Sequence, residues 1–386
     1  MNIRDQFLSV MSFDTSVPTM RWEMGYWAAA LRRWYAEGLP CADGIPPDLA
    51  DGDGVPGMGT GWSWGQPRAY DVERACDLDA SMERLPLNLL ACPAYGDEVI
   101  EEHGEWLIRR VASGVLRKEF RDRHSLPHDV GWPVRSRDDW ERFKAERLQP
   151  TLAGRLPDDW ASYVERYKTT QVPLVVGGYG FYSTPRLLMG EENLLYAFYD
   201  DPDLIHTMIN DLCDLWIAIY DQTLAHVHVD VGQIWEDMSF KNGPLISPAM
   251  VRTFLLPAYK RLTACWRDHG IKVVLLDTDG DCWSLIPILL EGGVTGLYPF
   301  EVNAGMNVVE VCKAFPRLQI VGGLDKTQVA LGRAAIDAEL AAKVPFMLKH
   351  GGYIPAFDHY VHPDVSWPHF AYYRKRISDM IRQQGG

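Results

Sequence analysis

The sequence predicts an α/β fold: a (β/α)8 TIM barrel with an N-terminal helical and irregular extension and a small antiparallel meander. From residue 172 onward, short apolar runs of strand length alternate with longer amphipathic segments. Such alternation indicates parallel strands with helices outside, and its repetition in a chain of 386 residues favours closure into one barrel. A doubly wound open sheet is the alternative, but no G-x-G-x-x-G motif follows a strand, which weakens it.

The N-terminal part is expected to form the extension. Residues 25–40, GYWAAALRRWYAEGLP, predict a helix, and the stretch 43–65, rich in Gly, Asp and Pro, predicts an irregular exposed loop. Residues 97–122 hold short apolar runs around two glycine-containing turns, which is typical of a small antiparallel meander.

The strands and helices of the barrel follow. The expected strands are PLVVGGYG (173–180), VDVGQIWEDMS (229–239), KVVLLDTDG (272–280), VTGLYPFEV (294–302), LQIVGGLDK (318–326) and GYIPAFDH (352–359). A segment of helical character follows each of them, including 194–225 and 247–270. We therefore expect one domain over 1–386, with the extension and excursions in 1–130 and the clearest barrel repeats in 170–386.

Composition excludes several classes of partner. The net charge of −14 repels phosphate backbones and anionic lipids, so neither nucleic acid nor a membrane is expected as a partner. No apolar run approaches the roughly 20 residues that span a bilayer, and the first residues lack a signal-peptide core. We expect a soluble, cytoplasmic protein. Its seven cysteines contain no C-x-x-C pair, which speaks against a disulfide framework or a thiolate zinc site.

Polar and aromatic residues collect where the expected strands end. They are Arg21, Glu23, Tyr179, Phe181, Glu236, Asp237, Asp277, Asp279, Glu301, Asp325, Lys326, Asp358 and His359. The carboxyl ends of barrel strands meet at one rim, so these side chains should converge. Asp277 and Asp279 should point the same way, because side chains alternate along a strand. Clustered carboxylates indicate a bound metal, a basic substrate or proton transfer. Asp-Gly after a strand is also a common turn, and we assign Asp281 to helix capping.

Three stretches carry a resemblance: WEDMSFKNGPLISPAMVRTFLLPAYKRL, LEGGVTGLYPFEVNAGMNVVEVCKAFPRLQIVGGLDK and GGYIPAFDHYVHPDVSWPHFAYY. They resemble the uroporphyrinogen decarboxylase superfamily, especially its branch of cobalamin-linked methyltransferases. The resemblance implies a barrel with its site at the C-terminal mouth. True decarboxylases have an MRQAGRY-type stretch whose arginines hold the substrate carboxylates. Here RWEMGYW keeps only Arg21, followed by Glu23, so the decarboxylation of a tetrapyrrole is not expected.

The resemblance also implies a metal site. Many members of the methyltransferase branch bind zinc through His-x-Cys after the strand that matches VVLL and through a Cys in the last loop. This sequence has Asp277 and Asp279 at the first place and His359 at the second. The implied ligands of zinc, or of another divalent metal, are therefore Asp277, Asp279 and His359, with Glu236 or Glu301 as further candidates. Some aromatic O-demethylases similar to this branch use such ligands, which favours an oxygen-linked methyl donor.

The implied activity is a metal-dependent methyltransferase, or demethylase, that moves a methyl group from a small aromatic or O-methylated substrate to a corrinoid. The chain has no D-x-H-x-x-G motif, so the corrinoid must arrive on a separate protein, with residues 41–66 as a lid or contact surface over the mouth. A homodimer is left open. The residues expected to act in catalysis are Glu236, Asp237 and His359. The residues expected to bind the substrate are Arg21, Glu23, Tyr179, Phe181 and Glu301.

Two other functions remain open. One is a decarboxylase or lyase for a small non-porphyrin substrate, with His359 as general acid or base and without metal or corrinoid. The other is a non-catalytic family member that binds an aromatic ligand. His226 and His228 alternate like a metal-binding pair, but they precede their strand and are expected at the opposite, N-terminal rim of the barrel.

Overall fold

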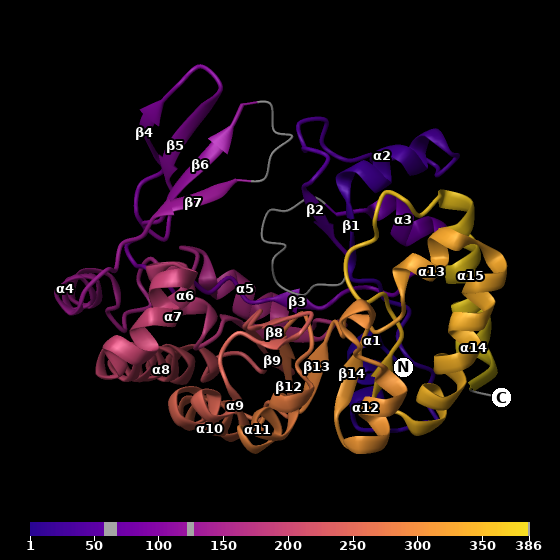
Figure 1. Cartoon of the computed structure of the whole chain (residues 1–386). Coiled ribbons are helices and arrows are strands. Elements are labelled where there is room, and N and C mark those ends of the chain that lie inside the picture. Colours follow the sequence, from indigo (N-terminus) through magenta and orange to yellow (C-terminus); the bar gives the residue numbers. More distant parts are fainter. Residues whose placement is uncertain (58–67, 122–126, 385–386) are drawn as a thin grey trace.

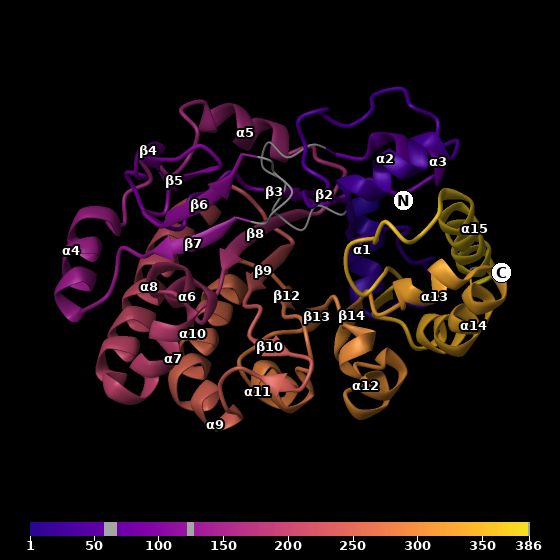
Figure 2. The ribbon, with the colours of Figure 1, turned by 45° about the horizontal axis from the view of Figure 1, so that its top comes forward.

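A curled, parallel, seven-stranded sheet forms the centre of the molecule, and helices lie outside it (Figures 1 and 2). The computed structural model describes residues 1–57, 68–121 and 127–384. The strand order is β15-β14-β13-β12-β9-β8-β3. The strands are β3 (Glu83–Arg84), β8 (Leu174–Tyr179), β9 (Val231–Trp235), β12 (Val273–Asp277), β13 (Gly296–Tyr298), β14 (Gln319–Val321) and β15 (Tyr353–Ile354). The strands expected from residue 172 onward are therefore confirmed.

Both faces of the sheet are buried, which explains why its strands are continuous apolar runs. Alternate residues such as Val231, Val273 and Leu275 point inward and pack with Met20 and Trp22. The opposite face packs against the surrounding helices in a larger core. The fold is compatible with a TIM-like barrel, and polar residues at the carboxyl ends of the strands lie at one mouth.

Residues 19–24 connect the two edges of the sheet. The hydroxyl of Thr19 donates to the carbonyl oxygen of Tyr353 on β15, at 2.6 Å. The indole of Trp22 donates to the carbonyl oxygen of Ala80, just before β3, at 3.0 Å. This segment is not a regular strand, yet it lies where an eighth strand would close the sheet. Its sequence, TMRWEM, carries the interior residues Met20, Trp22 and Met24 at alternate positions.

The helices from residue 191 onward lie mostly where the sequence predicts them, whereas most of those before it were not predicted. They are α1 (Ile3–Met11), α2 (Ala28–Ala36), α3 (Tyr70–Ala75), α4 (Arg137–Arg147), α5 (Trp160–Tyr167), α6 (Ser183–Met189), α7 (Glu191–Asp200), α8 (Pro202–Leu224), α9 (Pro248–Met250), α10 (Leu256–Asp268), α11 (Ile286–Glu291), α12 (Val308–Ala314), α13 (Lys326–Leu331), α14 (Arg333–His350) and α15 (Trp367–Gln384). The expected helix 194–225 breaks at Asp201, which caps α8 by accepting from the backbone N–H of Leu204. The expected helix 247–270 passes through a π-helical turn at Val251–Leu255.

The predicted meander is confirmed and extends further than expected, to residue 131. The strands β4 (Glu98–Glu102), β5 (Trp106–Arg110), β6 (Leu116–Phe120) and β7 (His128–Gly131) pair antiparallel in chain order. They project from the body of the molecule (Figure 1).

The expected helix at 25–40 begins only at Ala28, after β1 (Gly25–Trp27), which pairs with β2 (Gly54–Pro56). Of the loop expected at 43–65, residues 58–65 lie outside the described residues. No helix in the described part of the chain is long and apolar enough to cross a membrane.

Candidate active site

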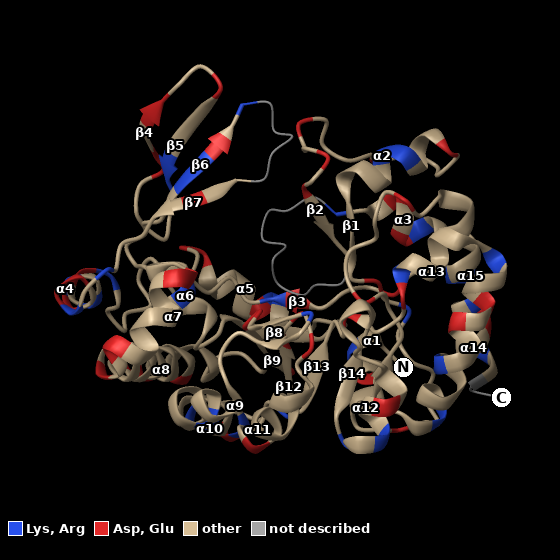
Figure 3. Ribbon diagram, in the orientation of Figure 1, with Lys and Arg blue, Asp and Glu red and all other residues tan. Residues whose placement is uncertain are grey.

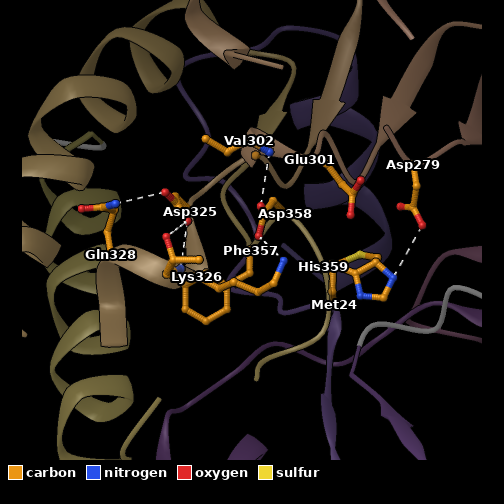
Figure 4. A network of polar contacts seen from close by, with 12 residues as sticks. Met24, Asp279, Glu301, Val302, Asp325, Lys326, Gln328, Phe357, Asp358 and His359 are labelled. Carbon is orange, nitrogen blue, oxygen red and sulfur yellow. Dashed lines mark hydrogen bonds and ion pairs between the residues drawn. The ribbon is translucent and has the colours of Figure 1, made fainter. Parts of the chain in front are cut away.

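Acidic side chains from neighbouring strand ends meet at the mouth of the curled sheet. Asp277 ends β12, and Asp279 follows it by two residues. Asp237 follows β9, and Glu301 follows β13. His359, after β15, points toward Asp279, and its Nε2 lies 3.8 Å from the Asp279 Oδ2 (Figure 4). The structure thus brings together Asp237, Asp277, Asp279 and Glu301 with the one imidazole. Asp281 caps the following turn by accepting from the backbone N–H of Trp283, as expected.

Burial and mutual repulsion dominate the electrostatics of this cluster. Burial, then the charges of Asp279 and Asp237, raises the pKa of Asp277 well above its usual value. Burial, then Glu301 and Asp237, raises the pKa of Asp279 to about 7. Burial and the nearby Lys326 lower the pKa of His359. A cation placed among these groups would therefore be strongly favoured.

Lys326 is already paired. Its Nζ lies 2.9 Å from Oδ1 of the fully buried Asp358, whose other oxygen accepts from the backbone N–H of Val302. Asp325 caps α13 by accepting from the N–H and hydroxyl of Thr327. These contacts, drawn in Figure 4, fasten the ends of β13, β14 and β15 to one another. We therefore assign Asp325, Lys326 and Asp358 to the architecture of the rim.

The donors at the mouth suit a divalent metal. The Asp279 Oδ1 is buried and has no hydrogen-bond partner among the described residues. Because buried polar atoms are normally hydrogen-bonded, this oxygen is a candidate to bind a ligand. Carboxylate oxygen and imidazole nitrogen are both ligands of zinc. The donor atoms of Asp277, Asp279 and His359 do not all lie within 4.8 Å of one another. In the described ranges only Asp221, Cys265 and His269 meet that distance, on α8 and α10.

Glu236, expected to be catalytic, has another position. It is fully buried, and its carboxylate accepts from the backbone N–H groups of Phe181, Tyr182 and Ser183, at 2.8 to 2.9 Å. The hydroxyl of Tyr259 donates to it as well. A side chain at Gly180 would collide with this carboxylate. Glu236 thus holds the turn after β8 and does not face the acidic cluster.

Replacing Glu236 by Gln should cost about 2–3 kcal/mol of unfolding free energy, because an amide cannot accept from all of these donors and leaves buried N–H groups unpaired. Urea denaturation measures this loss. Glu192→Gln, in the exposed first turn of α7, is the matched control and should change stability by less than about 0.5 kcal/mol. Equal stability of the two variants would contradict the role of Glu236 in holding this turn.

Two expected substrate-binding residues lie in the core. Glu23 is fully buried and forms an ion pair of 3.1 Å with the buried Arg374. Phe181 is also fully buried and packs against Trp216 and Tyr259, with ring centroids 4.9 and 5.5 Å apart. The expectation that they contact the substrate is therefore corrected. Both hold the barrel together.

Arg21 is engaged in ion pairs. Its guanidinium pairs with Asp79, at 2.6 Å, and with Asp77. These contacts tie residues 19–24 to the segment that leads into β3. The substrate-binding role expected of Arg21 would require the guanidinium to leave both carboxylates.

A cavity of about 440 Å³ opens beside the acidic cluster, at the ends of β3, β8 and β9. Tyr179 and Trp235 form part of its wall, and their rings meet edge to face with centroids 5.1 Å apart. Tyr179 is thus placed where the sequence predicts it. Asp237, one of the clustered acids, is linked to the cavity wall through Arg186. The Arg186 guanidinium donates to the carbonyl oxygen of Asp237 at 2.8 Å and to its Oδ2 at 3.0 Å. The same guanidinium stacks over the ring of Trp235.

A polar chain inside the barrel links the cavity to Asp277, and sequence reasoning missed it. Arg84 donates to the carbonyl oxygen of Gly177 and to Oε1 of Gln233. Gln233 donates to the hydroxyl of Tyr298, which hydrogen-bonds to the Asp277 carboxylate. A polar Gln at an inward position of the apolar run VGQIW was the one signal available. The two-residue strand that carries Arg84 leaves no apolar pattern to recognise.

Comparisons with known proteins agree with this architecture. A family model described as uroporphyrinogen decarboxylase (URO-D) matches residues 124–379, more than half of the chain. The fold is similar to that of a methyltransferase from Methanosarcina mazei, with 14% sequence identity, a TM-score of 0.57 and 99% of each chain covered.

A weaker likeness, with a TM-score of 0.35 and 11% identity, joins 58% of this chain to 70% of a candidate vitamin-B12-independent methionine synthase from Listeria monocytogenes. No curated protein matches the chain significantly. At 14% identity the likeness to the Methanosarcina mazei protein supports the fold alone.

Proposed function

The chain belongs to the uroporphyrinogen decarboxylase family, and we propose that it is a metal-dependent methyltransferase of that family. It moves a methyl group from a small aromatic or O-methylated substrate to a corrinoid on a separate protein. The observation that carries the proposal is the buried, unpartnered Asp279 Oδ1 beside His359, within a cluster of acids next to a cavity with aromatic walls.

We assign the side chains at the mouth to metal binding, to substrate orientation and to the negative charge of the site. Asp279 and His359 would hold the metal, with Asp277 as the third candidate ligand. When bound there, the metal would act as a Lewis acid toward the ether oxygen, which becomes a phenolate or alkoxide as the methyl group leaves. Tyr179 and Trp235 orient the substrate against the cavity wall. Asp237, fixed by Arg186, and Glu301, which accepts from the backbone N–H of Gly280 at 2.9 Å, keep the mouth negative.

The corrinoid protein would approach from the side of the strand ends. The meander reaches this side. Burial raises the pKa of Tyr179 at the end of β8, and the positive charge of Arg117 on β6 lies close enough to oppose that rise. The antiparallel pair of β1 and β2 reaches it from the other edge, because Trp27 stacks on His359 with ring centroids 6.3 Å apart. Figure 1 shows both elements standing above the sheet. Of residues 41–66, expected to contact the partner, 58–66 lie outside the described residues.

Metal content tests the proposal. Protein purified without chelators should carry about one zinc per chain, and both Asp279→Ala and His359→Ala should lose it. His362→Ala, whose exposed side chain pairs with Asp364 at 3.0 Å, is the matched control and should keep the metal. A wild type that binds no metal even after zinc is added would contradict the proposal. Zinc that disappears only in Cys265→Ser would place the metal on α8 and α10 instead.

One observation favours a second candidate function, a lyase or decarboxylase acting on a small non-porphyrin substrate. A carboxyl with a pKa of about 7 beside an imidazole is suited to donate or accept a proton near neutral pH. Turnover that is insensitive to a chelator but lost in Asp279→Asn would favour this candidate over methyl transfer.

A further inference from the structure

The cavity beside the acids has the opposite electrostatic character from the rest of the protein. The chain has 52 acidic and 38 basic residues, coloured red and blue in Figure 3, yet no Asp or Glu is among the described residues that line the cavity. Two arginines line it instead, Arg84 and Arg155. The remaining lining is mostly apolar and aromatic, including Tyr179, Trp216 and Trp235. A ligand that combines an apolar body with a negative charge matches this surface.

The two arginines differ in what they offer a ligand. Arg155 is buried, and its donors all go to backbone carbonyl oxygens, for example those of Asn88 at 3.0 Å and Leu90 at 2.8 Å. Its charge reaches the cavity, while its hydrogen bonds hold the surrounding backbone. Arg84 lies at the inward end of β3, and two of its hydrogen-bond acceptors, the carbonyl of Gly177 and the amide of Gln233, are neutral. Burial lowers the pKa of Arg84, so an anion near its guanidinium would be favoured.

The space next to Arg84 is apolar and open. Gly177 and Gly178 form part of the wall without side chains. A Cβ atom built at Gly178 meets only the side chain of Leu89, at 3.8 Å, so the backbone leaves room there for a ring. A volume of about 440 Å³ is within the range typical of small-molecule sites.

We propose that this cavity binds an aromatic carboxylate, with its carboxylate at the Arg84 guanidinium and its ring against Tyr179 and Trp235. In such a complex, a substituent on the far side of the ring points across the mouth toward Asp279 and His359. A methoxy group there is the one to be transferred. The identification of the ligand as the methyl donor rests on the proposed function, whereas the binding itself does not.

Isothermal titration calorimetry on the full chain at pH 7 tests the proposal with two probes, 4-methoxybenzoate and the neutral 4-methoxybenzyl alcohol. The wild type should bind the carboxylate at least about tenfold more tightly, as expected for one charge-assisted contact. Arg84→Met should abolish that preference. Arg376→Met, which removes a partly exposed arginine of α15 that pairs with Asp337, is the matched control and should retain it.

Gly178→Val locates the ligand without changing any charge. Its side chain fills the cavity, so it should weaken the binding of both probes by about tenfold or more. If Arg84→Met does not fold, Arg84→Lys, which keeps the charge and loses the planar fork, should reduce the preference by several-fold.

Equal affinity for the two probes in the wild type, or binding of neither, would overturn the proposal. So would a preference that survives the loss of Arg84. Asp279→Asn separates this proposal from the proposed function, because it should keep the binding preference while losing methyl transfer. If the wild type prefers the carboxylate but transfers no methyl group, the proposed ligand site is supported and the proposed methyltransferase activity is rejected.

Discussion

Replacing Asp279 by Asn should reduce methyl transfer by about 10³-fold or more, while leaving the fold intact. The carboxylate is the best-placed metal ligand at the mouth, and loss of the metal's stabilisation of a leaving oxygen costs several kcal/mol in the transition state. Initial rates with a methoxylated aromatic and a reduced corrinoid measure the effect. Asp281→Asn, two residues on and engaged in capping the next turn, is the matched control and should keep near-normal activity.

The same substitution should stabilise metal-free protein near neutral pH. The pKa of Asp279 is about 7 in the folded chain against 3.8 for the free side chain, so the folded state binds this proton more tightly than the unfolded state does. Stability therefore falls as the pH rises from about 4 to about 7. Asp279→Asn should flatten this fall and raise the melting temperature at pH 8 by about 2 °C or more. A lower melting temperature there would contradict the raised pKa.

The second large effect is expected at Arg374, far from the chemistry. Arg374→Met should lower the free energy of unfolding by about 3–5 kcal/mol, because it leaves the carboxylate of Glu23 buried without its partner. Glu23 also accepts from the backbone N–H of Phe357 at 2.7 Å, so the damage should spread to the loop after β15. Urea denaturation measures the loss. The double variant Glu23→Gln/Arg374→Met should be more stable than Arg374→Met alone.

This pair also decides the role of Glu23. If Glu23 holds the barrel together, Glu23→Gln should change stability and leave the KM of the methyl donor within about twofold. A strong rise in KM with unchanged stability would show that Glu23 contacts the substrate after all.

The architecture was predictable wherever the chain is regular. Strands buried on both faces leave long apolar runs, and the polar residues that end them predict the mouth, where the structure places Asp277, Asp279 and His359. The two-residue strand β3 was not predicted, because it is too short to show a hydrophobic period. Residues 19–24 alternate like a strand, but the sequence does not show that they join the two edges of the sheet. Helix ends at Asp201 and around Val251–Leu255 depend on capping and local geometry, which periodicity does not report.

The site was predictable only in part, because position along a strand fixes direction only while the strand lasts. Tyr179 ends β8 and faces the cavity as its alternation predicts. The chain turns at Gly180, so Phe181, two residues on, points into the core instead. Glu236 and Glu23 looked like site acids by position, but their buried partners, Tyr259 and Arg374, lie far away in the sequence.

The most direct test of the central claim follows the methyl group itself. Zinc-loaded wild-type protein is incubated with 4-methoxybenzoate carrying a ¹³C-labelled methoxy group and with reduced free cobalamin as acceptor. We expect the label on the corrinoid and an equal amount of 4-hydroxybenzoate, both absent with Asp279→Asn. If ligand binding is confirmed and the label nevertheless stays on the substrate, the mouth does not carry out methyl transfer and its acids serve another reaction.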